Sequence, residues 1–442
     1  MVNSAHVSAG AVGDRLPAGT RFGYALGSLS CGAFGTVPGL LLLPYLTDTL
    51  AVSASVAGLL VLLPKAWDVV FNPIAGRISD RAGTRRPFLL GGGIALAITF
   101  AALFAGPTTS SPTTGGLYVA AMFLLCATAF AFYQVPYNAL PAELVQDPTE
   151  RTRLTAWRIS VLAVAILASG AGAPALRDAI GGTTGYRVMG IAVGVLILLG
   201  AIGVYVGTAR APRARVLPSV TTWRETFAAV RDCRPFRWLL GAFVIQAVGI
   251  GTMLAGVDYL ARVVLEDRGA QSLLFAAFVG PALLVMPAWQ RVSARHGKRI
   301  GYVAATLVFA AGALGLLAAD VLPLAAVVAC AAIVGVGYAG IQVFPLAMLP
   351  DVISAEERRT GQLRAGLFAG VWTAGETLGL ALGPALYGLV LAAGGYVSSA
   401  GQDVTQPGGA AVAVVLGIAL VPALFALAGL ALLRRRVVEV SY

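Results

Sequence analysis

Three polar residues interrupt the apolar stretch at residues 53–79. Lys65, Asp68 and Asn72 are spaced i, i+3 and i+7, so they line one face if the stretch is helical. A carboxylate in apolar surroundings can bind a cation or a proton, because burial disfavours its charge whereas a neighbouring ammonium favours it. The spacing therefore indicates a cation- or proton-binding site built on Asp68 and Asn72. The alternative is a structural ion pair between Lys65 and Asp68.

Two further residues stand out in the long apolar run at 364–393. Trp372 and Glu376 are four positions apart, which makes them neighbours on a helix. Glu376 is a candidate for cation binding or substrate contact, and Trp372 is a candidate stacking surface. The alternatives are packing for Trp372 and, for Glu376, an ion pair with Lys65 or Arg158. Other polar candidates for substrate contact within apolar runs are Gln246 and Gln342.

The composition predicts the elements that hold these residues. The chain has 442 residues, of which 58% are hydrophobic and 12% charged, whereas soluble proteins have about 25% charged residues. Since a bilayer-spanning helix takes about 20 apolar residues, the apolar content suffices for about twelve. Continuous apolar runs exclude a transmembrane β-barrel. We expect an all-α polytopic membrane protein with spans at 21–47, 53–79, 88–106, 117–142, 155–175, 187–208, 236–262, 270–288, 300–319, 322–349, 364–393 and 409–433.

The distribution of charge predicts how these spans are oriented. The net charge of +11 does not indicate a nucleic-acid-binding protein, because the basic residues lie in short loops between apolar runs. Alternate loops are rich in arginine, and the positive-inside bias therefore predicts cytoplasmic termini. Asp258 and Tyr259, near the outer end of the seventh span, are expected to be gate or interface residues. The opposite loops hold only Arg177, Arg187, Arg262 and Arg268.

The small numbers of histidine and cysteine residues argue against a bound metal ion or cofactor. The chain has two histidines, four cysteines and no C-x-x-C pattern, so we expect no metal site and no cofactor. The remaining partners that we expect are a small-molecule substrate and the lipid bilayer, with the protein acting as a monomer.

Two pairs of matching segments indicate an internal repeat. Residues 77–85 and 291–299 share the pattern Arg-x-Ser-x-Arg-x-Gly-x-Arg at an offset of 214 residues. The segments Leu-Pro-Ala-Glu143 and Leu-Pro-Asp351 match at an offset of 209. Parallel repeats of this kind are typical of secondary transporters. We expect a tail at 1–20, a six-helix half at 21–208, a cytoplasmic connector at 209–234, a second six-helix half at 235–433 and a tail at 434–442.

This layout resembles that of the major facilitator superfamily. The segment from Gly76 to Arg86 looks like the superfamily's loop between spans 2 and 3, where a glycine lets helices approach, an aspartate caps a helix and arginines form ion pairs. The alternative is a basic loop that only sets topology. The resemblance implies a conformational gate formed by Gly76, Asp80, Arg81, Gly83 and Arg85, with Arg291, Arg295 and Gly297 as its repeat.

A narrower resemblance is carried by the segment Lys65-Ala-Trp-Asp-Val-Val-Phe-Asn-Pro73. It resembles the R-x-W-D-x-x-x-D-P segment of the glycoside–pentoside–hexuronide:cation symporters, the melibiose permease group. The resemblance implies that Asp68 binds the coupling cation or proton and that Lys65 and Arg158 belong to the substrate site. Further matches fall in both halves, at Tyr45-Leu-Thr-Asp48, 135–143 and 379–384.

The chain departs from that group at three expected site positions. Asn72 stands where the group has its second aspartate, Gln134 where it has a carboxylate, and Asn138 where it has an aromatic residue beside the sugar. Fewer carboxylates leave fewer hard oxygen ligands for Na⁺, so proton coupling or uniport is favoured over sodium. The same losses weaken the expectation of a simple galactoside as substrate.

These observations predict a secondary active transporter in the plasma membrane of a bacterium. It would move a sugar, glycoside or related conjugate by alternating access, coupled to H⁺ or Na⁺. The alternative on the same fold is an exporter of an amphipathic natural product or drug, or a lysolipid transporter. A membrane enzyme or a channel is disfavoured, because the chain has no nucleophile motif, nucleotide-binding loop or filter-like repeat.

Overall fold

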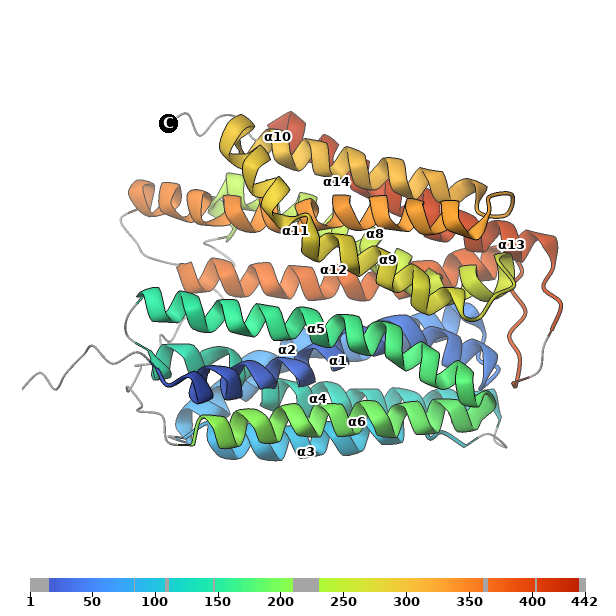
Figure 1. The fold of residues 1–442 in the computed structure, drawn as a ribbon, viewed down its shortest axis with the longest axis horizontal. Helices are drawn as coiled ribbons and strands as arrows, with labels where there is room; N and C mark the ends of the chain where they lie inside the picture. Colours follow the sequence, from blue (N-terminus) through green and yellow to red (C-terminus); the bar gives the residue numbers. More distant parts are fainter. Residues whose placement is uncertain are drawn as a thin grey trace, which may run out of the picture.

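The computed structural model describes residues 16–82, 84–107, 111–145, 148–209, 230–360, 365–401 and 404–436. These residues form helices and no strand, and the long helices run side by side along one axis (Figure 1). Within the described residues, eleven helices are long and apolar enough to cross a membrane, and Ala270–Leu284 is a shorter apolar helix. The prediction of an all-α polytopic membrane protein is confirmed.

The first half of the chain consists of six long helices. They are α1 (Ala18–Asp48), α2 (Ala54–Arg81), α3 (Arg86–Leu103), α4 (Pro112–Leu144), α5 (Pro148–Ile180) and α6 (Gly182–Gly207). The second half is more interrupted and includes two π-helical segments and a 3-10 turn. Its elements are α8 (Arg234–Tyr259), η1 (Leu260–Val264), α9 (Ala270–Leu284), α10 (Met286–Gly315), η2 (Leu316–Ala318), α11 (Leu324–Thr360), α12 (Ala365–Ala393), α13 (Gly408–Val415), η3 (Leu416–Leu420) and α14 (Val421–Arg436).

The eighth and ninth spans differ from the prediction of separate helices at 270–288 and 300–319. Helix α9 ends at Leu284 and α10 begins at Met286, with Pro287 in the first turn of α10. Helix α10 then continues to Gly297, where φ is +82° and ψ is 160°. Because glycine adopts positive φ without steric cost, the chain can change direction there without a loop. The eighth span is therefore α9 followed by the first third of α10.

Helix packing shows that the two halves share one arrangement. In the first half, α1 packs on α5 and α6, α3 packs on α4 and α6, and α2 packs on α4. The second half repeats these contacts, since α8 packs on α12 and α14, α10 packs on α11 and α14, and α9 packs on α11. The halves meet through α2 with α12 and α5 with α9, a pair of contacts related by the same symmetry, and through α1 with α8.

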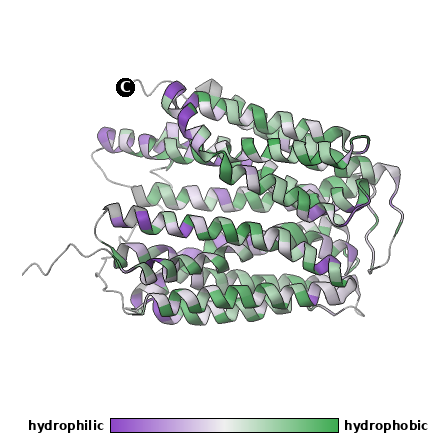
Figure 2. Cartoon of the chain, viewed as in Figure 1, coloured by the Kyte–Doolittle hydropathy of each residue, from purple (hydrophilic) through white to green (hydrophobic). Residues whose placement is uncertain are grey.

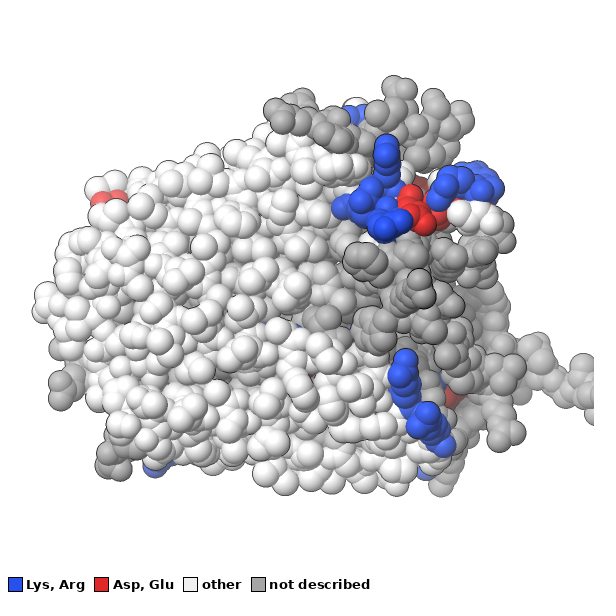
Figure 3. Space-filling view, turned by 180° about the vertical axis from the view of Figure 1, so that it is seen from behind, with Lys and Arg blue, Asp and Glu red and all other residues white. Residues whose placement is uncertain are grey.

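The two ends of the bundle differ in charge. Helix α1 begins and α14 ends at the same end, on the left in Figure 1, which we call the terminal end, and we call the opposite end the distal end. Apolar residues cover the length of the helices in Figure 2. On the face drawn in Figure 3, Lys and Arg side chains gather at the terminal end and the long flank is nearly free of charge.

Candidate functional site

The polar cluster of α2 lies near the middle of that helix. Lys65 Nζ is 4.0 Å from Asp68 Oδ2 and 4.7 Å from the centroid of the Phe34 ring, which is a cation–π distance. Asp68 is 4% exposed. Its Oδ1 atom and Asn72 Oδ1 are buried and have no hydrogen-bond partner among the described residues. Buried polar atoms are normally paired, so these two oxygens are unusual: the carboxylate oxygen is available to accept a proton, and both oxygens are available to contact a small cation.

A second polar group joins α4 and α5. Arg158 Nη2 donates a hydrogen bond of 2.5 Å to Asn138 Oδ1, and the guanidinium lies 5.0 Å from the centroid of the Tyr137 ring. Gln134 is half-buried one turn before Asn138 on α4. The structure thus brings together three predicted site residues. The charge of Arg158 is met by an amide and an aromatic ring, and none of the ion pairs among the described residues includes it.

The second half has an equivalent pair of opposite charge. Gln342 Nε2 of α11 donates to Glu376 Oε1 of α12 at 3.3 Å. Because α11 and α12 are the counterparts of α4 and α5, this pair corresponds to Asn138 with Arg158. Among the ion pairs of the described residues, none joins Glu376 to Lys65 or Arg158, so the alternative suggested by the sequence is not formed in this conformation.

Two other candidates for substrate contact, Gln246 and Trp372, lie in the core of the second half. Gln246 is 1% exposed; its Oε1 accepts from the Tyr302 hydroxyl, and its Nε2 donates to Thr306 Oγ1 at 3.3 Å and to the Ala426 carbonyl at 3.1 Å. Trp372 is buried against the Phe243 ring, with centroids 4.5 Å apart. These contacts fit a packing role for both residues better than substrate contact.

The predicted gate residues that the structure describes lie at the terminal end, where ion pairs connect helices of the same half. Arg85 Nε is 2.7 Å from Glu143 Oε1, which joins α3 to α4. The repeat has its counterpart, since Lys298 Nζ is 2.5 Å from Asp351 Oδ2 and joins α10 to α11. The matching segments found in the sequence thus form matching ion pairs. Because neither pair crosses between halves, neither holds the halves together in this conformation.

The remaining gate candidates make fewer contacts. A Cβ atom added at Gly76 would meet Val135 Cγ1 at 3.5 Å, an ordinary contact, so no close helix approach requires glycine here. Gly297 forms the direction change in α10. The side chain of Asp80 and the whole of Gly83 lie outside the described residues. The other gate arginines, Arg81, Arg291 and Arg295, have exposed side chains at the terminal end.

The two halves are joined at the distal end by a chain of charged side chains, which we call the distal latch. Arg177 Nη1 is 2.7 Å from Asp258 Oδ1, and Asp258 Oδ2 accepts from Arg262 Nε at 2.7 Å. Arg262 Nη2 lies 2.5 Å from Asp48 Oδ2, and Asp48 Oδ1 accepts from the Tyr396 hydroxyl at 2.8 Å. Asp48 and Arg177 belong to the first half, and the other three residues to the second.

Burial makes this latch a strong interaction. Asp258 is 0% and Arg177 5% exposed, and charge-assisted hydrogen bonds strengthen where water is excluded. Burial and the neighbouring Asp48 carboxylate raise the pKa of the Tyr396 hydroxyl, which therefore remains a hydrogen-bond donor at neutral pH. As the sequence suggested, Tyr259 also contacts the other half, through a 2.7 Å hydrogen bond between its hydroxyl and Thr47 Oγ1.

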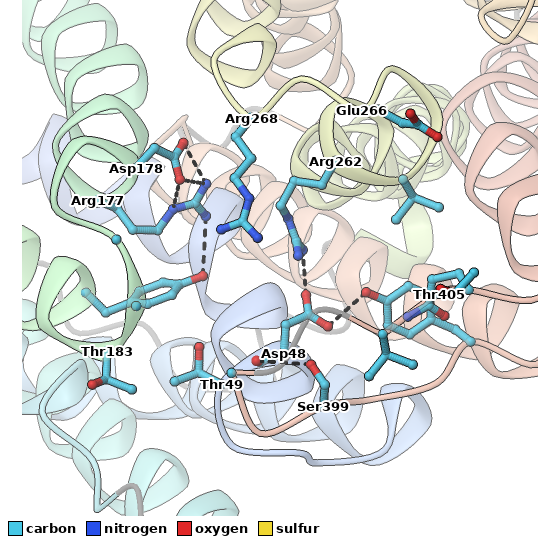
Figure 4. A pocket seen from close by; sticks show the side chains of 18 of the residues that line it. Asp48, Thr49, Arg177, Asp178, Thr183, Arg262, Glu266, Arg268, Ser399 and Thr405 are labelled. Carbon is cyan, nitrogen blue, oxygen red and sulfur yellow. Dashed lines mark hydrogen bonds and ion pairs between the residues drawn. The ribbon is translucent and has the colours of Figure 1, made fainter.

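A polar cavity of about 780 Å³ opens beside the latch and is lined by both halves. Figure 4 shows the Arg177, Arg262 and Arg268 side chains around it, with Asp48 and Asp178 among their neighbours. The sequence placed Asp258 and Tyr259 at a gate or interface but did not predict this cavity. One signal was present: Arg177 and Arg262, two of the few basic residues in the loops opposite the arginine-rich ones, are the cations of the latch.

Comparison with known proteins identifies the family. Residues 23–438 match the family described as MFS/sugar transport protein. The chain belongs to this family. It is accordingly a membrane transporter and not an enzyme, and the resemblance to the major facilitator superfamily and to its glycoside:cation symporters is confirmed.

Relatives of this MFS/sugar transport protein are named as symporters and sugar transporters. An uncharacterised symporter of Synechocystis sp. is 26% identical, over 95% of this chain and 94% of its own. A putative glycoside/cation symporter of Escherichia coli is 27% identical, over 88% and 85%. The isoprimeverose transporter of Lactiplantibacillus pentosus is 23% identical, over 88% and 83%.

Solved structures support the fold of this family member. A bacterial homologue of the human lysosomal transporter Spinster, in an inward-facing and unoccupied conformation, matches with a TM-score of 0.66 and 16% identity over 94% of both chains. The nucleoside transporter NupG matches with a TM-score of 0.64 and 13% identity, over 95% of this chain and 100% of its own. The predicted fold of two pseudo-symmetric six-helix halves is confirmed.

Proposed function

We propose that this transporter carries a sugar or glycoside across the bacterial plasma membrane together with a proton. The substrate class rests on the relatives named as glycoside and isoprimeverose transporters. The coupling rests on one observation, the buried and unpaired Oδ1 of Asp68 beside Lys65. The substrate and coupling-ion sites of secondary transporters lie near the middle of the membrane, and Asp68 lies near the middle of α2.

The choice of proton over Na⁺ follows from the available oxygen atoms. A proton needs a single acceptor, whereas Na⁺ needs several oxygen ligands. The face of α2 offers one carboxylate, Asp68, and one amide oxygen, that of Asn72. Among the described residues, no group of three or more His, Cys, Asp or Glu side chains could hold a metal ion.

The polar residues of both halves provide hydrogen bonds for a hydroxylated solute. Arg158, Asn138 and Gln134 would contribute from the first half, and Gln342 and Glu376 from the second. Donors and acceptors divided between the halves let a solute bridge them, which couples its binding to their relative movement. This division supports a sugar over the alternative substrates, an amphipathic product or a lysolipid, whose apolar parts would not use these groups.

Transport by purified protein in liposomes tests the coupling. Asp68→Asn should abolish accumulation of glycoside driven by a pH gradient and leave exchange of labelled for unlabelled glycoside intact, because exchange needs substrate binding but no net proton movement. The matched control is Asp320→Asn, which removes an exposed acid outside the polar cluster. Undiminished accumulation in Asp68→Asn, or accumulation driven only by a Na⁺ gradient, would contradict proton coupling at this residue.

We also propose the orientation and the state of assembly. The arginine-rich terminal end would face the cytoplasm, with halves at 21–208 and 235–433, the cytoplasmic connector at 209–234 and a monomeric protein. A fluorescent protein fused to the C-terminus should fold and fluoresce in cells, whereas an alkaline phosphatase fused there should be inactive. The reverse pattern would contradict the orientation, and a dimer mass in detergent by light scattering would contradict the monomer.

A further inference from the structure

The last turn of α1 is bound by a short segment of the other half. We call this segment the strap; it comprises residues 396–401, between α12 and α13. The strap backbone donates from Ser399 N to the Thr47 carbonyl at 2.9 Å and from Gly401 N to the Asp48 carbonyl at 2.8 Å. In return, the Ser399 carbonyl accepts from Ala51 N at 3.1 Å. Three backbone hydrogen bonds thus cross between halves at the distal end.

These hydrogen bonds complete the cap of α1. The last four carbonyls of an α-helix have no partner within the helix and are normally satisfied by nearby residues of the same chain segment or by water. Here two of them, those of Thr47 and Asp48, are satisfied by the strap. The carbonyls of Tyr45 and Leu46 accept from residues 49–52 of the same half, so the strap of the opposite half supplies the second part of the cap, which is complete only while the distal end is closed.

The charge of the Asp48 side chain also favours the arrangement in which the distal end is closed. A negative charge at a helix C-terminus is unfavourable, because the helix dipole is negative there. In the closed arrangement this carboxylate is offset by Arg262 at 2.5 Å and by the Tyr396 hydroxyl at 2.8 Å. Both partners belong to the second half, so separating the halves at this end leaves Asp48 with the helix dipole alone.

We propose that Asp48 and the strap set the conformational preference of this transporter in favour of closure at the distal end. Opening that end removes the strap's hydrogen bonds to the last two carbonyls of α1 and uncovers the Asp48 charge in one step. Asp48 is thus a positioning residue, which acts on the movement of the halves and not on the solute. The inference relies on the alternating access of the proposed function, but on neither the substrate nor the coupling ion.

Accessibility of a buried position behind the latch provides the test. Ala173 is 4% exposed on α5, three residues after Gly170, which packs directly against Phe275 of α9. A cysteine at position 173 is treated from the distal side with a membrane-impermeant maleimide, and the labelled peptide is quantified by mass spectrometry. Because this measurement needs no substrate, it remains informative if the proposed solute or proton coupling is wrong.

We expect Asp48→Asn to increase the labelling rate several-fold and Asp48→Glu to restore slow labelling in part. Tyr396→Phe, which keeps the ring and removes one donor, should give a smaller increase. Asp320→Asn removes an exposed acid outside the latch and should label like the parent. Equal rates in Asp48→Asn, Tyr396→Phe and parent would overturn the proposal, as would an equal increase in Asp320→Asn. The melting temperature in detergent shows whether each variant is folded. If Asp48→Asn is not folded, the labelling rate of Tyr396→Phe decides the test.

Discussion

Single residues in the membrane-spanning part fall into two groups according to how their polar atoms are satisfied. Arg158 and Glu376 are each held by one neutral amide, at 2.5 Å and 3.3 Å respectively, and are in no ion pair among the described residues. In Gln246, by contrast, both the amide oxygen and the amide nitrogen form hydrogen bonds within the core. Charges with only a neutral partner can gain from binding a solute, whereas a satisfied amide cannot.

Replacing Arg158 should affect transport more than stability. Arg158→Gln keeps a side chain able to reach Asn138 but removes a charged donor, and a hydrogen bond to a charged group contributes about 1.5–3 kcal/mol. We expect substrate affinity to fall by about 10- to 100-fold, with little change in melting temperature. The measurement is substrate binding to the purified protein. Unchanged affinity would remove Arg158 from the substrate site.

Replacing Gln246 should have the opposite effect. Gln246→Leu removes three hydrogen bonds between helices of the second half, each contributing about 0.6 kcal/mol in a membrane protein. We expect a lower free energy of unfolding, by about 1–2 kcal/mol, and an unchanged KM in the protein that remains folded. Thermal unfolding and uptake kinetics check the two parts. A raised KM at unchanged stability would place Gln246 in the substrate site after all.

Helices α2 and α12 approach closely across the halves at two glycines. A Cβ atom added at Gly388 would lie 2.3 Å from the Ala54 carbonyl oxygen, and one added at Gly58 would lie 2.9 Å from Ala385 Cα. Both contacts are with backbone, which cannot move aside as a flexible side chain can. The two glycines therefore permit the distal closure of two long helices.

Gly388→Ala should open the distal end without disturbing either half. The added methyl group separates α2 from α12, so we expect faster maleimide labelling of a cysteine at position 173 and a shift in transport kinetics. The control on the same helix is Gly370→Ala, since nothing lies within 4 Å of a Cβ atom there. Labelling of Gly388→Ala at the parent rate would show that this contact does not determine closure.

At the scale of the molecule, the hydrogen bonds and ion pairs that join the halves gather at one end of the described bundle. The cross-half hydrogen bonds and ion pairs described above connect distal ends of helices, whereas the Arg85–Glu143 and Lys298–Asp351 pairs at the terminal end stay within a half. This asymmetry describes one conformation of an alternating-access cycle, with the distal side closed. Transport requires that the distal contacts break in another conformation.

A disulfide across the distal end should stop transport reversibly. The backbones of Ala51 and Ser399 are hydrogen-bonded at 3.1 Å, so we expect cysteines at the two positions to form a disulfide. Oxidation of Ala51→Cys/Ser399→Cys should abolish uptake, and a reductant should restore it. Each single variant serves as a control for the substitution. Full uptake by the cross-linked protein would show that this end need not open.

Much of the fold could be predicted because its causes are local in the chain. Twelve apolar runs, arginine-rich alternate loops and the repeated Arg-x-Ser-x-Arg-x-Gly-x-Arg segments indicate a membrane bundle of two related halves. The pair Lys65 and Asp68 could be placed together as well, since i, i+3 spacing on a helix makes them neighbours. The turn at Gly297 falls within the predicted connection between the spans 270–288 and 300–319, but the helical conformation of residues 289–296 was missed, because apolar character alone does not show that a helix continues beyond an apolar run.

The sequence by itself determined which segments cross the membrane and which charges lie among them, because burial in lipid is a property of each segment alone. Only the tertiary structure decided how those charges are paired. Asp48, Arg177 and Arg262 come from three helices far apart in the chain, and their meeting depends on the relative position of two halves. A position that changes during transport is not encoded in any local pattern, so the distal latch became visible only in the folded molecule.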